Sequence, residues 1–471
     1  MQNVLASRYA SQPMVDLWST EGRVVMERHF WIALLEAQRE LGIDVPDGVV
    51  DAYRAVVHQV DLDSIREREK VTRHDVKARI EEFCALAGHE HIHKGMTSRD
   101  LTENVEQLQV RRSLDLVQDR IVATLARLGR LSAENSDLVM VGRSHNVAAQ
   151  ATTLGKRFAS AAEELLVAYG RIVDLVASYP LRGLKGPVGT QQDQLDLFDG
   201  DAEKVNRLER AVAGHLGFEV VLDSVGQVYP RSLDFDVVSA LVQASGGPSS
   251  LARTIRLMAG QELATEGFRS GQVGSSAMPH KMNARSCERV NGLALVLRGH
   301  LAMVGGLVGD QWNEGDVSCS VVRRVALPDS FLAVDGIFQT FLTVLDEFGV
   351  YPKVVESEVA RYLPFLATTR VLVAAVQAGM GREAAHEVIG EHAIAAALAR
   401  REQGVVETDL MDRLASDPRL PLDRAVLDDL LADPSTFVGN ADNQVGAVIQ
   451  KIADVVAARP AAAAYDPEPI L

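Results

Sequence analysis

Cysteine is scarce in this sequence, with only Cys84, Cys287 and Cys319 among 471 residues. Three widely spaced cysteines cannot form a disulfide framework or a cysteine-rich zinc site. Aromatic residues are also few, at 5%, whereas alanine, leucine, valine and glutamate are plentiful. This balance favours helix over strand and predicts a helical protein without disulfides.

Long hydrophobic runs are missing as well. No uncharged apolar stretch reaches the roughly 18 residues that a membrane-spanning helix needs. Residues 1–16 lack the apolar core of a signal peptide. We therefore expect a cytoplasmic protein with no membrane partner.

Positive charge is in deficit, because 48 Lys and Arg residues face 64 Asp and Glu residues and give a net charge of −16. Such a surface repels phosphate backbones, which argues against a nucleic-acid partner. A small anionic ligand remains compatible with it, because a local group of arginines can dominate one cleft.

Helical periodicity, in contrast, is abundant. Apolar residues three or four positions apart between Asp100 and Leu131 predict one helix of about 30 residues, with Asp100 and Glu103 as its capping pair. Similar stretches predict long helices at 148–178, 234–265, 286–308 and 318–348. Strand signals are nearly absent, and only 219–228 is typical of a short extended piece. The Ala- and Pro-rich segment 459–471 is expected to pack loosely.

These elements predict an all-α fold of three helical domains, because the chain is too long for one ordinary core. The predicted domains are an N-terminal helical domain at 1–98, a central bundle of very long helices at 99–350, and a C-terminal helical domain at 351–471. Long helices with apolar stripes on more than one side usually bury the extra stripe against other subunits, so we expect a helical oligomer.

One segment matches a zinc-binding motif in sequence, but its context does not favour a metal site. Residues 89–93 match H-E-x-x-H, in which two histidines on one face of a helix bind zinc. Gly88 and Gly95 flank this segment, so a helix that aligns the histidines is not expected, and we predict no metal site. A loop with ordinary surface histidines is the simpler interpretation.

The loop 271–284 carries the strongest chemical signal. Its glycines and the pair Ser275-Ser276 place several N–H and hydroxyl groups where an oxyanion could be held. Lys281 adds a positive charge and Asn283 a neutral donor. The alternative interpretation is a solvated linker between two helices.

Three further segments combine cations with imidazoles, and two of them, 72–75 and 93–100, also carry a carboxylate. His145, in Gly142-Arg143-Ser144-His145, is expected near a helix start and is a candidate general acid, because imidazole titrates near neutrality. A histidine that merely caps the helix is the alternative. The segments 72–75 and 93–100 are similar in character, and the second ends at the N-terminus of the long helix, where free N–H groups favour anions. Each segment alone could be a solvated turn.

Together these motifs resemble the fumarase/aspartase superfamily, whose signature is the loop Gly274–Asn283. Other segments are similar to the adenylosuccinate lyase branch in particular, and they extend the resemblance over nearly the whole chain. They are 7–11, 72–76, 226–229, 285–289, 351–353 and 363–365.

The resemblance implies a carbon–nitrogen lyase that releases fumarate from adenylosuccinate, giving AMP, and from succinylaminoimidazole carboxamide ribotide. It implies no cofactor and no metal. It also implies a homotetramer whose core is formed by the central helices and whose sites are each shared by three subunits.

The resemblance also implies roles for individual residues. Ser275 is the expected general base and His145 the general acid, with His93 and Glu288 in support. The expected substrate-binding residues are Arg8, Tyr9, Arg73, His74, Asp75, Thr97, Ser98, Gln227, Ser276, Lys281, Asn283, Arg289, Ser320 and Arg324.

Two positions depart from the family pattern. Ala284 stands where many relatives have proline after the loop asparagine. Gly315 stands where relatives have an arginine that contributes to the phosphate pocket, so Arg323 or a neighbour is the expected substitute. The alternatives are another superfamily enzyme, such as argininosuccinate lyase or a carboxymuconate cycloisomerase, and a non-catalytic structural homologue.

Overall fold

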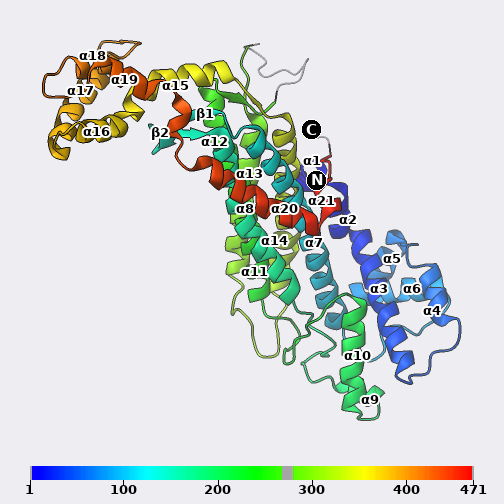
Figure 1. Ribbon diagram of the computed structural model, residues 1–471. Coiled ribbons are helices and arrows are strands. Elements are labelled where there is room, and N and C mark those ends of the chain that lie inside the picture. Colours follow the sequence, from blue (N-terminus) through cyan, green and yellow to red (C-terminus); the bar gives the residue numbers. More distant parts are fainter. Residues whose placement is uncertain (1–2, 268–277, 279, 469–471) are drawn as a thin grey trace.

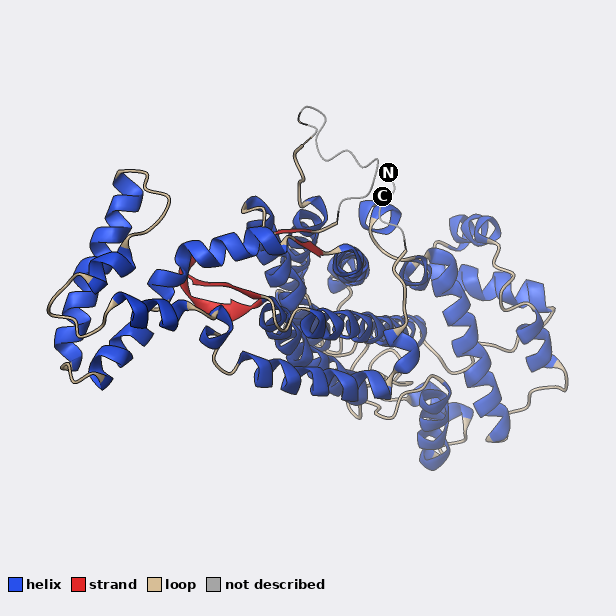
Figure 2. Cartoon of the chain, turned by 45° about the horizontal axis from the view of Figure 1, so that its top comes forward, coloured by secondary structure: helices blue, strands red, loops and turns tan. Residues whose placement is uncertain are grey.

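The computed structural model describes residues 3–267, 278 and 280–468, and helices dominate them (Figures 1 and 2). This confirms the predicted all-α class. The first helices form the N-terminal part, at one side of the molecule in Figure 1. They are α1 (Val4–Arg8), α2 (Gln12–Trp18), α3 (Thr20–Glu40), α4 (Val49–Ala55), α5 (Leu62–Thr72) and α6 (Asp75–Ala87).

Long helices build the centre of the molecule, as predicted. They are α7 (Ser98–Glu134), α8 (Leu154–Ser178), α11 (Ser232–Ala244), α12 (Gly246–Gly260), α13 (Arg285–Gly305) and α14 (Cys319–Glu347). Two shorter helices, α9 (Gln192–Leu197) and α10 (Ala202–His215), lie at one end of this bundle (Figure 1).

Helix α7 is the axis of the bundle. It has 37 residues, which corresponds to about 55 Å at 1.5 Å per residue. The predicted capping pair was wrong by one turn, because Thr97 is the N-cap and Asp100 is the residue that closes a capping box with it. We call the end of the bundle at Ser98 the α7-N end and the end at Glu134 the α7-C end.

Helices α13 and α14 run between these two ends and are joined by residues 306–318. Ser320, in the first turn of α14, lies within 3.5 Å of the Arg99 guanidinium at the α7-N end. Helix α13 has 21 residues, so its own first residue, Arg285, lies about 30 Å away towards the α7-C end.

A β-hairpin at the α7-C end replaces part of a predicted helix. Strands β1 (Val139–Ser144) and β2 (Val147–Thr153) pair antiparallel, and helix α8 begins only at Leu154. The prediction of helix from 148 was wrong because the alanine-rich β2 has helical propensity, but pairing with β1 overrides it. His145 and Asn146 form the two-residue turn, with φ of 53° and 62°, as such turns require.

The other predicted long helices needed smaller corrections. The stretch 234–265 is two helices that meet at Ser245, and the second ends at Gly260 before strand β3 (Ala264–Thr265), which pairs with β4 (Gly349–Val350). The extended piece predicted at 219–228 is confirmed in part, because Val221 bridges Leu181. Residues 89–93 form a loop, as expected, and the three cysteines are free.

The last part of the chain forms a smaller helical unit and then returns to the bundle. Its elements are α15 (Pro352–Leu366), α16 (Thr368–Gln377), α17 (Arg382–Glu402), α18 (Leu410–Ala415), α19 (Arg424–Leu431), the 3₁₀ helix η1 (Pro434–Phe437), α20 (Ala441–Ala458) and α21 (Pro460–Ala463). Helices α16 to α19 enclose a core of their own, whereas Val445, Val448 and Ile452 of α20 belong to the main core. The predicted domain boundaries stay a prediction.

Residues 459–468, the described part of the segment predicted to pack loosely, are anchored to the bundle. The Arg120 guanidinium lies 3.4 Å from the ring centroid of Tyr465, whose hydroxyl donates to Gln339 Oε1 at 3.0 Å. A side chain that can reach both α7 and α14 therefore anchors the segment.

Helix α14 is, by length and composition, apolar enough to cross a membrane, but 83% of that window is buried inside the protein. Phe331, Ile337 and Phe338 are fully buried in the main core. Its apolar surface is therefore the surface that holds the bundle together.

Candidate active site

Seven of the predicted substrate-binding residues line one cavity of about 300 Å³ at the α7-N end, which we call the α7-N cavity. Four different parts of the chain supply them: the start of α6, the start of α7, a loop after α10, and the start of α14. They are His74, Asp75, Thr97, Ser98, Gln227, Ser320 and Arg324.

His74 joins two of these parts. Its Nδ1 accepts a hydrogen bond from the backbone N–H of Lys77 at 3.2 Å and thereby caps α6. The neutral imidazole must then carry its proton on Nε2, which lies 3.3 Å from the Ser98 hydroxyl and can donate to it. The capping bond therefore fixes a tautomer that presents a donor to the cavity.

Asp75 is held as a carboxylate. Burial raises the pKa of its side chain, but Arg79, at 3.1 Å, and the backbone N–H of Val76 outweigh burial and leave the pKa below its usual value. An ionised group at the edge of the cavity can accept hydrogen bonds from a ligand but repels ligand anions.

Beneath the α7-N cavity lies a buried network of charges. Arg323 contacts Asp234 at 2.7 Å and Glu106 at 2.8 Å, and it also donates to the Tyr229 hydroxyl. Glu103 pairs with Arg231 at 2.9 Å. These groups are fully or almost fully buried, and their mutual pairing fixes the floor of the cavity.

His93 does not line the α7-N cavity and contacts Trp31 instead. Its Nδ1 accepts a hydrogen bond from the Trp31 indole N–H at 3.1 Å. Burial lowers the pKa of His93 to about 4, so the side chain is neutral near pH 7 and its proton is on Nε2. Arg73, the remaining predicted residue of this region, is exposed, has φ of 48° at the end of α5, and does not line the cavity.

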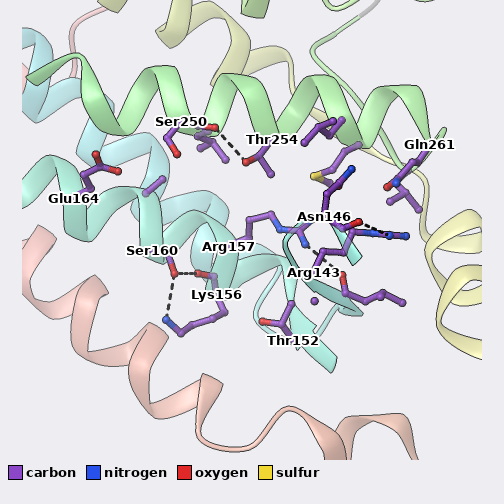
Figure 3. A pocket seen from close by; sticks show the side chains of 17 residues that line it. Arg143, Asn146, Thr152, Lys156, Arg157, Ser160, Glu164, Ser250, Thr254 and Gln261 are labelled. Carbon is purple, nitrogen blue, oxygen red and sulfur yellow. Dashed lines mark hydrogen bonds between the residues drawn. The ribbon is translucent and has the colours of Figure 1, made fainter. Parts of the chain in front are cut away.

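The predicted general acid lies at the opposite end of α7. His145 is at the tip of the hairpin and is exposed, so the expectation that it lies at a helix start was wrong. Beside the hairpin is a cavity of about 610 Å³ between the hairpin, α8 and α12, and Arg143, Lys156 and Arg157 are among the residues that line it (Figure 3). We call it the hairpin cavity.

Part of the signature loop also reaches the α7-C end. Ser275 and Ser276 lie outside the described residues. Lys281, Asn283 and Glu288 line a third cavity of about 980 Å³, which shares Leu257 with the hairpin cavity and which we call the loop cavity. Glu288 is exposed and lies 3.7 Å from Arg256.

Arg8, Tyr9 and Arg289 gather beside the start of α13. The Arg289 guanidinium lies 5.4 Å from the ring centroid of Tyr9. Burial lowers the pKa of Arg289, Tyr9 raises it, and the positive charge of Arg8 lowers it further. These residues therefore belong to the half of α13 that carries the loop, rather than to the α7-N cavity.

Comparisons with known proteins agree with this arrangement. The profile of a family described as Lyase matches residues 10–299, and one described as Adenylosuccinate lyase C-terminus matches residues 364–448. The chain is 36% identical to the adenylosuccinate lyase of Saccharomyces cerevisiae, over 95% of this chain and 93% of the relative. The chain belongs to the adenylosuccinate lyase family.

A further relative supports the same membership, and two solved structures share the fold. The adenylosuccinate lyase of Schizosaccharomyces pombe is 34% identical over 95% of this chain and 93% of its own. Among solved structures, a 3-carboxy-cis,cis-muconate lactonizing enzyme from Pseudomonas putida has a TM-score of 0.83 at 21% identity, covering 97% of this chain and 100% of that one. A fumarate lyase from Mesorhizobium sp. BNC1 has a TM-score of 0.78 at 21% identity, covering 94% and 98%. These neighbours share the fold of the adenylosuccinate lyase family.

The departure from the family at Gly315 has a local structural basis. Gly315 has φ of 139°, and a Cβ there would lie 2.9 Å from Cβ of Gln227. An arginine is therefore strained in this backbone. Arg323 does not replace the missing cation, because it is fully buried and paired with Asp234 and Glu106.

Two arginines that received no role from the sequence line the α7-N cavity instead. Arg99 is next to Ser98 on α7, with its side chain 21% exposed, and lies 3.5 Å from the Ser320 hydroxyl. Arg23 of α3 lines the same cavity. The position of Arg99 at the start of a helix was visible in the sequence, but its proximity to α14 depends on tertiary packing.

Proposed function

We propose that this chain eliminates fumarate from adenylosuccinate, giving AMP, and from succinylaminoimidazole carboxamide ribotide, giving the carboxamide ribotide, in the cytoplasm and without a cofactor. The observation that carries the proposal is the α7-N cavity, where seven residues with family-assigned substrate roles meet from four parts of the chain. Membership of the adenylosuccinate lyase family supports the same substrates.

The chemistry requires charge stabilisation next to a base. Removal of a proton from the carbon beside a succinyl carboxylate produces a doubly negative aci-carboxylate, and fixed donors around it are worth several kcal/mol. In the proposal Ser275 takes this proton, while Ser276, Lys281 and Asn283 hold the carboxylates. The exposed Lys281 at the edge of the loop cavity is compatible with this role.

The leaving nitrogen needs a proton from the other side. We assign this step to His145, whose exposed position at the hairpin tip leaves it accessible to a substrate. Glu288 supports a histidine by its charge, and neutral His93 supports the substrate pocket through the N–H on its Nε2. The carbon–nitrogen bond breaks as the nitrogen takes this proton, and fumarate and the amine product are released.

These groups require more than one chain. Within one chain the α7-N cavity and the hairpin lie at opposite ends of a helix of about 55 Å. We therefore propose a homotetramer in which the α7-N cavity of one chain meets the hairpin and loop of others. Exposed apolar side chains on the central helices support this packing: Val167 on α8, Leu257 on α12 and Leu295 on α13 are 66%, 49% and 67% exposed.

The substrate phosphate is assigned to the cationic side of the α7-N cavity. Ser320 and Arg324 supply the family-type contacts, and Arg99 supplies the cation that Gly315 cannot. Arg8 and Tyr9 are also proposed to hold the ribotide phosphate. The other family contacts, Arg73, Gln227 and Arg289, are proposed to bind the rest of the substrate.

A direct assay tests the proposal. Purified protein is mixed with adenylosuccinate, and the ultraviolet spectrum is followed for conversion to AMP and fumarate. Turnover of argininosuccinate in place of adenylosuccinate would show that the proposed substrate is wrong and that the activity is that of another branch of the superfamily. Lack of turnover with either substrate would favour a non-catalytic homologue.

The roles are tested by two variants. Ser275→Ala and His145→Ala are each expected to lower kcat by a factor of about 10²–10⁴ while helicity and assembly remain. A near-normal rate in either variant would remove that residue from the mechanism.

A further inference from the structure

A fourth cavity, of about 430 Å³, lies between the hairpin and the C-terminal helices. We call it the arginine pocket. Strand β1 contributes Arg143, helix α15 contributes Arg361, Tyr362 and Phe365, and helix α17 contributes Arg400 and Arg401. No carboxylate belongs to its lining.

Three arginines surround one aromatic ring in this pocket. The guanidinium carbons of Arg143, Arg361 and Arg400 lie 5.6, 5.6 and 5.0 Å from the ring centroid of Tyr362. Arg400 is also 5.5 Å from the ring centroid of Phe365. The rings attract cations through their faces, but they do not neutralise charge.

The positive charge of the pocket is only partly compensated. Arg143 is ion-paired with Glu358. Arg361, Arg400 and Arg401 have no carboxylate within 4.0 Å among the residues that the structure describes. In a chain with a net charge of −16, this local excess of cations is unusual and favours a bound anion.

Shape and chemistry select the kind of anion. Guanidinium groups bind phosphate through paired N–H donors, and aromatic rings and guanidinium planes both stack on a nucleobase. A volume of about 430 Å³ is within the range of small-molecule sites. We propose that the arginine pocket binds a nucleoside phosphate, with its phosphates on Arg361, Arg400 and Arg401 and its base against Tyr362 and Phe365.

The arginine pocket shares no residue with the α7-N cavity, although Arg143 and Asn146 in its lining flank His145, the proposed general acid of the elimination site. In one chain the pocket lies at the α7-C end, beside the hairpin, whereas the proposed phosphate contacts Ser320 and Arg324 lie at the α7-N end. Ligand binding at the arginine pocket requires its charges and rings and does not require turnover.

The experiment uses a protein in which the proposed phosphate contacts of the elimination site are already disabled. ADP is titrated by calorimetry into full-length protein that carries Ser320→Ala and Arg324→Ala. Addition of Arg361→Ala and Arg400→Ala is expected to weaken ADP binding at least about tenfold. The matched control adds Arg382→Ala on α17 and Arg413→Ala on α18, two ion-paired arginines of the C-terminal helices that do not line the pocket. Equal ADP affinity in the two quadruple variants would overturn the proposal.

A second pair of measurements separates base from phosphate. Tyr362→Leu is expected to weaken ADP binding about tenfold and to leave pyrophosphate binding unchanged. If Tyr362→Leu leaves ADP binding unchanged, the ligand is an anion without a base, and the nucleoside assignment is wrong. Melting temperatures verify folding. Arg361→Lys with Arg400→Lys keeps the charges and is expected to retain ADP binding with lower affinity. If the alanine variants do not fold, this lysine variant provides the test.

Discussion

The two ends of the α7 bundle differ in how they are built. At the α7-N end the proposed site residues lie in a small cavity above a buried network of paired charges. At the α7-C end they lie on an exposed hairpin tip and beside larger, more open cavities. One end is organised by its own chain, whereas the other presents side chains outward.

This difference indicates which half of the chemistry each end performs. Binding of a nucleotide requires fixed contacts, and the α7-N end supplies them from four segments of one chain. Proton transfer requires groups that can approach the substrate from outside, and the α7-C end supplies them on a turn and a loop. A complete site then arises only when unlike ends of different chains meet.

The largest expected effect comes from mixing two inactive variants. His145→Ala disables the α7-C end and Ser98→Ala with Arg324→Ala disables the α7-N end, so each protein alone is expected to lose a factor of about 10²–10⁴ in turnover. After co-refolding at equal amounts, on the order of a quarter of the sites should combine two intact ends. The measurement is adenylosuccinate turnover of the mixture.

Two controls define the outcome. Mixing without refolding should restore nothing if assembly is stable, and mixing two different α7-N variants should restore nothing under any condition. Absence of recovery in correctly assembled mixed tetramers would show that each chain builds its own site. The two ends of α7 would then not divide the binding and proton-transfer steps between chains.

The second effect concerns the buried charges below the α7-N cavity. Arg323→Met leaves Asp234 and Glu106 without their shared partner, and removal of one member of a buried ion pair costs about 3–5 kcal/mol. Arg324→Met, at the adjacent exposed position, is the matched control and should change the free energy of unfolding by less than about 0.5 kcal/mol. Denaturant titration of both variants measures the difference, and similar losses would mean that the network does not stabilise the floor.

Sequence reasoning worked best where structure is local. The long α7 was predictable because apolar residues repeat at helical spacing over about 30 residues. The hairpin was not, because alanine-rich β2 has helical propensity and only its pairing with β1 makes it a strand. The same failure misplaced His145, which was expected at a helix start and lies in the turn.

The candidate site shows the same limit. Motifs identified His74, Ser98 and Ser320 through family resemblance, and the structure places these three around one cavity. The role of Arg99 could not be predicted, because its distance to Ser320 depends on how α14 packs on α7. The rejection of Arg323 required knowledge of its burial, which residue type alone does not provide.

The third effect is a pH dependence of stability at the α7-N end. His93 has a pKa of about 4 in the folded protein and an ordinary value of 6.5, so below pH 6.5 the unfolded chain binds the proton more readily. The contribution of His93 to the free energy of unfolding is therefore complete above pH 6.5. It is lost as the pH decreases towards 4, by up to about 3 kcal/mol. His93→Asn, which tolerates the positive φ, should show a smaller loss between these pH values in denaturant titrations. Identical pH profiles would show that His93 is not the group responsible.

The smallest effect tests the proposed phosphate cation of the α7-N cavity. Arg99→Gln is expected to raise KM for adenylosuccinate about tenfold with little change in kcat, because a charge-assisted contact to the phosphate is lost far from the reacting bond. Arg112→Gln, an exposed arginine on the same helix, is the control and should leave KM unchanged. The effect should disappear with the dephosphorylated substrate succinyladenosine. If Arg99→Gln raises KM equally for both substrates, the side chain positions the cavity wall rather than binding the phosphate, and the cation that replaces the family arginine is another residue of this cavity.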